Sequence, residues 1–132
     1  MRKTFWCGFL LALAIWPASG QTNTVERGKY LVNDVAMCGD CHTPRLPNGQ
    51  FDQSRWLKGT ELDFAPVRPT PNWAKYAPDI TKSGIKWSEQ EMASYLQTGR
   101  DPGGRIARPP MPAYRLNRQD AEAVARYLQS LK

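Results

Sequence analysis

The chain has 132 residues, of which 41% are hydrophobic, and it carries a formal net charge of +6 at pH 7. This length fits one small domain, and the positive charges form no Lys/Arg-rich run, so the composition gives little support to nucleic-acid binding. Only three cysteines are present, which is too few for a disulfide scaffold.

Residues 1–20 have the pattern of a signal peptide. Arg2 and Lys3 form a positive start, an apolar stretch follows, and small residues lead up to Gly20. The pattern predicts cleavage after Gly20, export to the periplasm, and a mature domain of residues 21–132. Retention as an uncleaved anchor is the alternative, although the apolar stretch is short for a transmembrane helix.

The first predicted helix covers residues 23–36, with Asn23 as its cap. We expect Val25, Tyr30, Leu31 and Val35 to line one side of this helix. Gly28 lowers helix propensity by about 1 kcal/mol relative to alanine. A glycine at this position therefore predicts that another helix approaches closely there.

A C-x-x-C-H motif follows this helix directly, as Cys38-Gly39-Asp40-Cys41-His42. It is the attachment signature of a c-type haem, in which two thiols bond to the porphyrin and the histidine binds the iron. His42 is the only histidine of the chain, so a zinc site or a Cys–His catalytic pair would lack partners. The motif predicts one covalent haem c on Cys38 and Cys41, with His42 as an axial ligand. We expect His42 to donate its other ring N–H to a backbone carbonyl, with the nearby Pro44 carbonyl as one candidate acceptor. Redox use of the two thiols without haem is the alternative.

Residues 43–86 are rich in proline and glycine, which break any long periodicity. Regularly spaced aromatic residues make the segment too apolar for disorder, and a loop wrapped around a flat cofactor reconciles the two observations. Candidate contacts to the haem edge or propionates are Tyr76, Asp79, Thr81 and Trp87. Ordinary packing or turn formation would explain each of these four residues equally well.

A second predicted helix begins at Ser88 and stops at Gly99. The last predicted helix follows Asn117 and carries small and apolar residues at helical spacing. We expect the first and last helices to cross, because both offer small residues for a close approach. The predicted contacts place Gly28 and Tyr30 against Val124, Tyr127 and Leu128.

A second iron ligand is predicted between these two helices. Met111 is flanked by three prolines, which favour an extended backbone outside helix and strand, and such a rigid segment can hold a flexible thioether near a metal. Met37 is tied to the histidine side, and Met92 is better explained as a core residue. We therefore predict Met111 as the second axial ligand.

Five arginines flank this segment: Arg100, Arg105, Arg108, Arg115 and Arg118. They predict a positive rim that steers an acidic partner or pairs with a haem propionate. A solvated basic face is the alternative.

Several segments together carry a family resemblance: residues 27–32, C-G-D-C-H-T-P-R at 38–45, residues 78–88 and 98–100, Met111-Pro112, and residues 125–131. In these the chain resembles monohaem class I c-type cytochromes, above all the cytochrome subunits of periplasmic dehydrogenases. The resemblance implies an all-α cytochrome c fold, with three to four helices and long irregular loops around one covalent haem. It also implies Cys38 and Cys41 as thioether sites, and His42 and Met111 as axial ligands.

Two positions depart from the family pattern. Asp79 stands where asparagine is expected, and Lys86 where glycine is expected. Both lie in the loop expected near the haem, so the propionate contacts in this loop do not carry over from the family.

These features predict an electron-transfer protein that is not itself an enzyme. It would be a soluble carrier or the electron-accepting subunit of a dehydrogenase, with a periplasmic dehydrogenase or a terminal oxidase as redox partner. We expect no nucleic-acid partner and no permanent membrane span after signal cleavage. The alternative is a haem enzyme with a labile distal ligand, peroxidase-like or sulfur-oxidising, which would need an acid–base group beside the iron.

Overall fold

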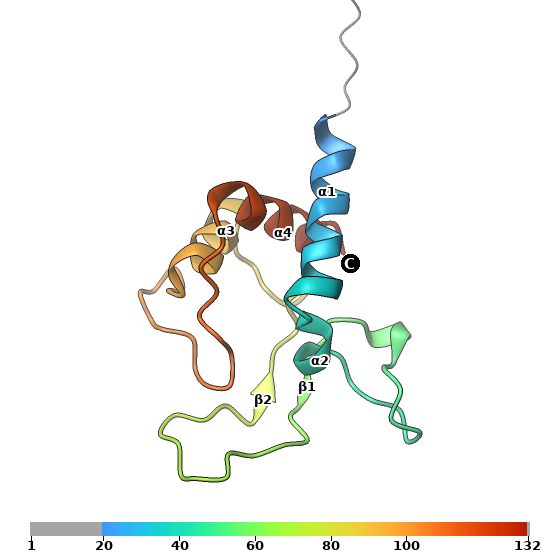
Figure 1. The fold of residues 1–132 in the computed structure, drawn as a ribbon, viewed down its shortest axis with the longest axis vertical. Helices are drawn as coiled ribbons and strands as arrows, with labels where there is room; N and C mark the ends of the chain where they lie inside the picture. The colour runs from blue at the N-terminus through green and yellow to red at the C-terminus, as the bar shows by residue number, and fades with distance from the viewer. Residues whose placement is uncertain (1–19, 132) are drawn as a thin grey trace, which may run out of the picture.

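The computed structural model describes residues 20–131, so the predicted signal peptide lies outside the described residues except for Gly20 (Figure 1). The regular secondary structure of the described part is helical apart from one short antiparallel ribbon, and long irregular loops connect its elements, which confirms the predicted all-α fold. The elements are α1 Gly20–Tyr30, a π-helical turn η1 Leu31–Val35, α2 Cys38–His42, a 3-10 turn η2 Gln53–Arg55, β1 Thr60–Glu61, β2 Tyr76–Ala77, α3 Glu89–Thr98 and α4 Arg118–Ser130.

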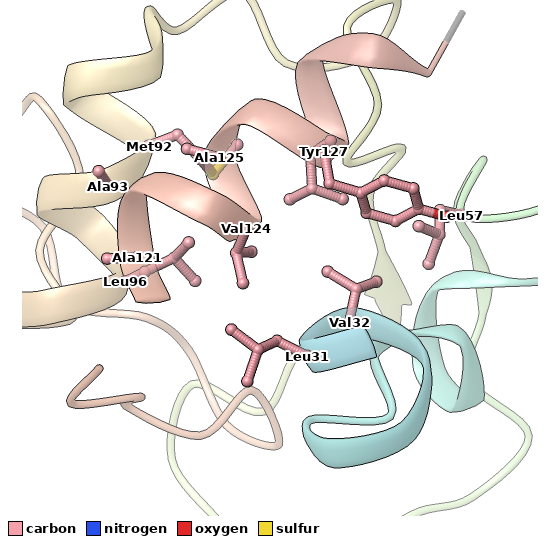
Figure 2. Close-up of a cluster of buried hydrophobic side chains, with 11 residues drawn as sticks. Leu31, Val32, Leu57, Met92, Ala93, Leu96, Ala121, Val124, Ala125 and Tyr127 are labelled. Carbon is pink, nitrogen blue, oxygen red and sulfur yellow. The ribbon is translucent and has the colours of Figure 1, made fainter. Parts of the chain in front are cut away.

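The core lies where α4 packs between α1 and α3. Figure 2 shows Val124 facing Leu31 across this junction, and the ring of Tyr127 directed toward Leu57. A Cβ atom on Gly28 would overlap the carbonyl oxygen of Ala123, so only glycine permits this helix crossing. The predicted crossing of the first and last helices is therefore confirmed at Gly28.

The first helix differs from its prediction at both ends. It begins at Gly20, so Asn23 lies within the helix instead of capping it, and its regular part ends at Tyr30. Tyr30 and Val35 are each 51% exposed, contrary to the prediction, whereas Leu31 is buried and Val25 packs against the core as expected. Val32, which was not predicted, is buried beside Leu31.

The reason is geometric. Leu31 and Val32 follow Gly28 by three and four residues and share its face, whereas Tyr30 points about 200° away from Gly28 around the helix. The π-helical turn then closes through a hydrogen bond from the Ala36 N–H to the Leu31 carbonyl (2.8 Å). This wider turn carries Val35 away from the buried face.

Local capping signals predicted the ends of the other two long helices. Ser88 and Glu91 form a reciprocal capping box at the start of α3, and Gly99 ends that helix in the left-handed conformation with φ 71°. The Asn117 side chain accepts the N–H of Asp120 at the start of α4 (2.9 Å). Met92 is 3% exposed in the core, as expected.

Long irregular segments connect these elements, among them residues 99–117 between α3 and α4 (Figure 1). Residues 43–59 and 78–88 run beside α2 and the core, and residues 62–75 form an arm that extends from the β1–β2 ribbon, away from α3 and α4. Thr60 pairs with Ala77 and Glu61 with Tyr76 in the ribbon. The ribbon thereby fixes the position of residue 78, immediately after β2, relative to residues 57–59.

Candidate haem-binding site

The two cysteines and the histidine of the motif lie on the single short helix α2. Met37 precedes this helix in the left-handed conformation with φ 49°, which turns the chain sharply away from the π-helical turn. Both thiols are free and partly buried. Burial raises the pKa of Cys38 to about 11 and raises the pKa of Cys41 as well. Redox-active C-x-x-C pairs have lowered thiol pKa values, so the raised values give the thiol-exchange alternative no support.

His42 is held in one orientation. Its side chain is buried, and Nδ1 lies 2.7 Å from the carbonyl oxygen of Pro78. A carbonyl can only accept, so Nδ1 carries the proton and Nε2 keeps the lone pair that a metal ion takes. Burial lowers the pKa of His42, although the Pro78 carbonyl opposes this shift, and the neutral ring is the form that binds metals.

A backbone carbonyl was the predicted partner of His42, and that prediction is confirmed. The suggested candidate, Pro44, is wrong, because its carbonyl accepts the N–H of Asp52 (2.8 Å). Sequence proximity suggested Pro44, whereas the true acceptor lies 36 residues away.

A backbone network fixes the Pro78 carbonyl beside His42. The Gly59 N–H donates to the His42 carbonyl (2.7 Å), and the Ile80 N–H donates to the Leu57 carbonyl (3.1 Å). The buried Thr43 hydroxyl accepts the N–H of Leu57 (3.0 Å). These bonds join the residues that follow His42 to both sides of the ribbon.

Gly59 allows the backbone at residues 57–59 to lie close to Pro78 and Asp79. It adopts φ +83°, and a Cβ there would lie 2.6 Å from the Asp79 nitrogen and 2.7 Å from the Pro78 carbonyl carbon. The sequence identified Gly59 only as a breaker of periodicity, and nothing in its neighbours indicated a contact with Pro78. Gly39 plays a similar part on α2, because a Cβ there would overlap the ring of Trp56.

Asp79, the departure from the family pattern, has local partners. It accepts the N–H and the hydroxyl of Thr81 (2.8 and 2.7 Å), and its carboxylate lies 3.8 Å from Nζ of Lys58. Burial acts to raise the pKa of Asp79, but the Thr81 hydrogen bonds and the Lys58 charge outweigh it, so the pKa lies below its usual value. Lys86, the second departure, is exposed. Asp79 and Thr81 therefore stabilise the turn behind His42.

The other two candidate contacts divide between packing and exposure. Trp87 is partly buried and packs edge-on against Tyr95, with ring centroids 5.2 Å apart. Tyr76 is 58% exposed on β2. Trp87 therefore belongs to the packing of α3, and Tyr76 lies at the surface.

Met111 lies in the coil between α3 and α4 and is partly buried. Its segment forms a turn instead of the expected extended chain, because the Met111 N–H donates to the Arg108 carbonyl (3.0 Å). The Tyr114 hydroxyl donates to the Ala36 carbonyl (2.8 Å), which connects this segment to the residues just before Cys38. Burial raises the pKa of Tyr114 to about 12, so the hydroxyl keeps its proton and remains a donor.

Most of the predicted arginine rim is engaged with neighbouring groups. Arg105 pairs with Asp101 (2.7 Å) and Arg118 with Glu122 (2.7 Å), each four residues apart. Arg100 donates to the Gly104 carbonyl (3.1 Å), and Arg108 donates to two backbone carbonyls of the arm. These contacts favour the solvated-face alternative for Arg105 and Arg118, and a structural role for Arg108.

The donor set on α2 fits a covalent haem: two thiols one turn apart and a neutral imidazole with its inner nitrogen fixed. No span-forming helix is found within residues 20–131, since none there combines sufficient length with sufficient apolarity. The fold and the motif together are those of a c-type cytochrome domain.

Comparison with known proteins assigns the family. Residues 25–132 match the family model of cytochrome c, and the chain therefore belongs to the cytochrome c family. Membership implies covalent haem c.

Three relatives show which cytochromes the chain is similar to. A diheme cytochrome c-type protein of Cereibacter sphaeroides is 38% identical, over 79% of this chain and 34% of its own length. The fructose dehydrogenase cytochrome subunit of Gluconobacter japonicus is 37% identical, over 80% and 22%. The gluconate 2-dehydrogenase cytochrome c subunit of Pantoea cypripedii is 31% identical, over 89% and 28%. The chain thus spans about a third or less of the length of these relatives.

Proposed function

We propose that this domain transfers electrons in the periplasm through one covalent haem c. Cys38 and Cys41 form the thioethers, and His42 and Met111 are the axial ligands. It acts as a soluble carrier or as the electron-accepting subunit of a dehydrogenase, and is not itself an enzyme. One observation carries the proposal. His42 lies on the same short helix as both cysteines, and its Nδ1 is 2.7 Å from the Pro78 carbonyl oxygen.

Haem iron, when bound, supplies a one-electron change between the ferric and ferrous states. The residues of the chain set how that change occurs. The Pro78 carbonyl orients the imidazole and increases the basicity of Nε2. Met111 would hold the iron through its thioether, which would favour the reduced state and leave the metal no site for a substrate.

Two of the relatives support a dehydrogenase as the redox partner, since their names identify them as cytochrome subunits of fructose dehydrogenase and gluconate 2-dehydrogenase. A terminal oxidase is the other candidate partner. The single C-x-x-C-H motif supports one haem in this chain, although one relative is a diheme protein. Export and cleavage after Gly20 are supported by the N-terminal pattern alone.

The test is export of the full chain in cells with haem-attachment machinery, followed by haem quantification and N-terminal sequencing. We expect one haem per chain, resistant to acid–acetone extraction, and a mature end at Gln21. Loss of covalent haem in a Cys38→Ala/Cys41→Ala double variant is also expected. A wild-type protein that is colourless, and equally stable with and without the haem-attachment machinery, would overturn the proposal in favour of the thiol alternative.

Cyanide binding separates a carrier from a haem enzyme. The ferric wild-type protein should bind cyanide slowly and weakly, because Met111 occupies the site, and Met111→Ala should bind it readily. Rapid binding to the wild type would contradict the proposed ligation and support a labile distal ligand.

A further inference from the structure

Two side-chain contacts fix the segment that carries Met111. At its start, the Arg108 guanidinium donates from Nε to the Asn72 carbonyl (3.1 Å) and from Nη2 to the Trp73 carbonyl (3.2 Å). The adjacent Pro109 carbonyl accepts the N–H of Ala74 (2.7 Å). Residues 108–109 are thereby bonded to three consecutive residues of the arm.

The second contact lies three residues after Met111. The partly buried Tyr114 ring packs against the core, and its hydroxyl donates to the Ala36 carbonyl (2.8 Å). Ala36 precedes Cys38 by two residues. This bond therefore connects the methionine segment to the segment that carries the cysteines and the histidine.

Arg108 is suited to its contact by shape as well as by charge. Its planar fork presents donors in fixed directions to two carbonyl groups, whereas a lysine ammonium is a single point charge on a flexible stem. Asn72 adopts φ +59°, in the left-handed region that asparagine tolerates better than most residues, and its carbonyl accepts from Nε of Arg108.

We propose that Arg108 and Tyr114 are positioning residues that hold Met111 in place as the second iron ligand. The two contacts are called the methionine clasp. The inference rests on the proposed His42/Met111 ligation. The methionine side chain has three rotatable bonds and its thioether has little directional preference, so the side chain does not fix the position of its own sulfur atom. A fixed backbone on both sides of the residue is needed to hold that sulfur at a set distance from a metal. The clasp fixes that backbone on both sides of Met111.

The clasp has a measurable consequence in ligand exchange. An external ligand binds only the fraction of molecules in which Met111 has left the iron, so the apparent dissociation constant reports that fraction. A hydrogen bond of ordinary strength changes such an equilibrium by a factor of about 10. Arg108→Gln and Tyr114→Phe should each tighten cyanide binding to the ferric protein about tenfold and weaken the far-red absorption band of sulfur-bound ferric haem.

Arg105→Gln is the matched control, because Arg105 belongs to the same coil and its side chain pairs with Asp101 alone among residues 20–131. It should bind cyanide as the wild type does. Arg108→Lys keeps the charge and loses the fork, and should resemble Arg108→Gln. If Arg108→Lys binds cyanide as the wild type does while Arg108→Gln binds it more tightly, the clasp is overturned in favour of a charge effect.

Met111→Ala makes the two proposals separable. If it leaves the far-red band and cyanide binding unchanged, the proposed ligation fails. If it changes both while Arg108→Gln and Tyr114→Phe behave as the wild type, the ligation stands and the clasp is overturned. Circular dichroism checks folding, and if Arg108→Gln does not fold, Tyr114→Phe decides, because it removes only one oxygen atom.

Discussion

The two sides of the candidate site are built differently. On the histidine side, residues 42–43 are buried, and they are joined to residues 57, 59 and 78 through the Thr43 hydroxyl, the His42 carbonyl and the His42 ring. On the methionine side, Met111 is partly buried in a coil, and its position depends on the side chains of Arg108 and Tyr114. A buried hydrogen-bond network opens only with much of the fold, whereas a coil held by a few contacts opens locally. In the proposed haem site we therefore expect the histidine side to be the permanent attachment and Met111 to be the adjustable ligand.

The largest expected effect comes from Gly59. Gly59→Ala introduces a Cβ against Pro78 and Asp79 in a left-handed conformation, and we expect a loss of about 3 kcal/mol in the free energy of unfolding. Gly49→Ala is the control, because Gly49 has the same φ of +83° with nothing within 4 Å of the added atom. Chemical denaturation of both holoproteins gives the comparison. Equal losses would show that backbone strain alone is responsible and that the contact with Pro78 is unimportant.

Thr43 tests the network at a single hydrogen bond. Thr43→Val leaves the buried N–H of Leu57 without its acceptor, at a cost of about 2 kcal/mol. Thr43→Ser keeps the hydroxyl and should recover about half of that loss. The same denaturation measurement applies, and a valine variant as stable as the wild type would remove Thr43 from the account.

Asp79 gives a smaller, pH-dependent effect. Its pKa is lowered in the folded state, so it contributes stability above the pKa of an unfolded aspartate, and this stability is lost as pH falls through the folded-state value. Asp79→Asn should therefore reduce stability by about 1 kcal/mol at pH 7 and flatten the decline in stability below about pH 4. Denaturation at a series of pH values checks both. A variant with the wild-type acid profile would contradict the role given to the Thr81 hydrogen bonds.

Asp101 offers the corresponding test on the methionine side. Its pKa is lowered by the Arg105 backbone N–H, which outweighs the opposing effect of burial, and its ion pair is with the exposed side chain of Arg105. Asp101→Asn should change stability less than Asp79→Asn over the same pH series. A larger effect at Asp101 would contradict the proposal that the histidine side is held more firmly than the methionine side.

The sequence predicted what depends on local patterns. Ser88 with Glu91, Gly99 and Asn117 mark helix ends through bonds within a few residues, and the motif on α2 carries its own chemistry. It did not predict that Pro78 contacts His42, because the contact depends on backbone bonds between distant segments that leave no side-chain signature. Tyr30 was misplaced because its aromatic character outweighed its angular position on the helix.

The most direct test of the unequal anchoring is a guanidinium titration of the ferric holoprotein, with far-red absorption and far-ultraviolet circular dichroism recorded together. The account predicts that the far-red band of the Met111–iron bond disappears at a lower denaturant concentration than the helical signal, while the haem stays attached. Coincident loss of both signals would contradict it, and absence of the far-red band from the native protein would refute Met111 as the ligand.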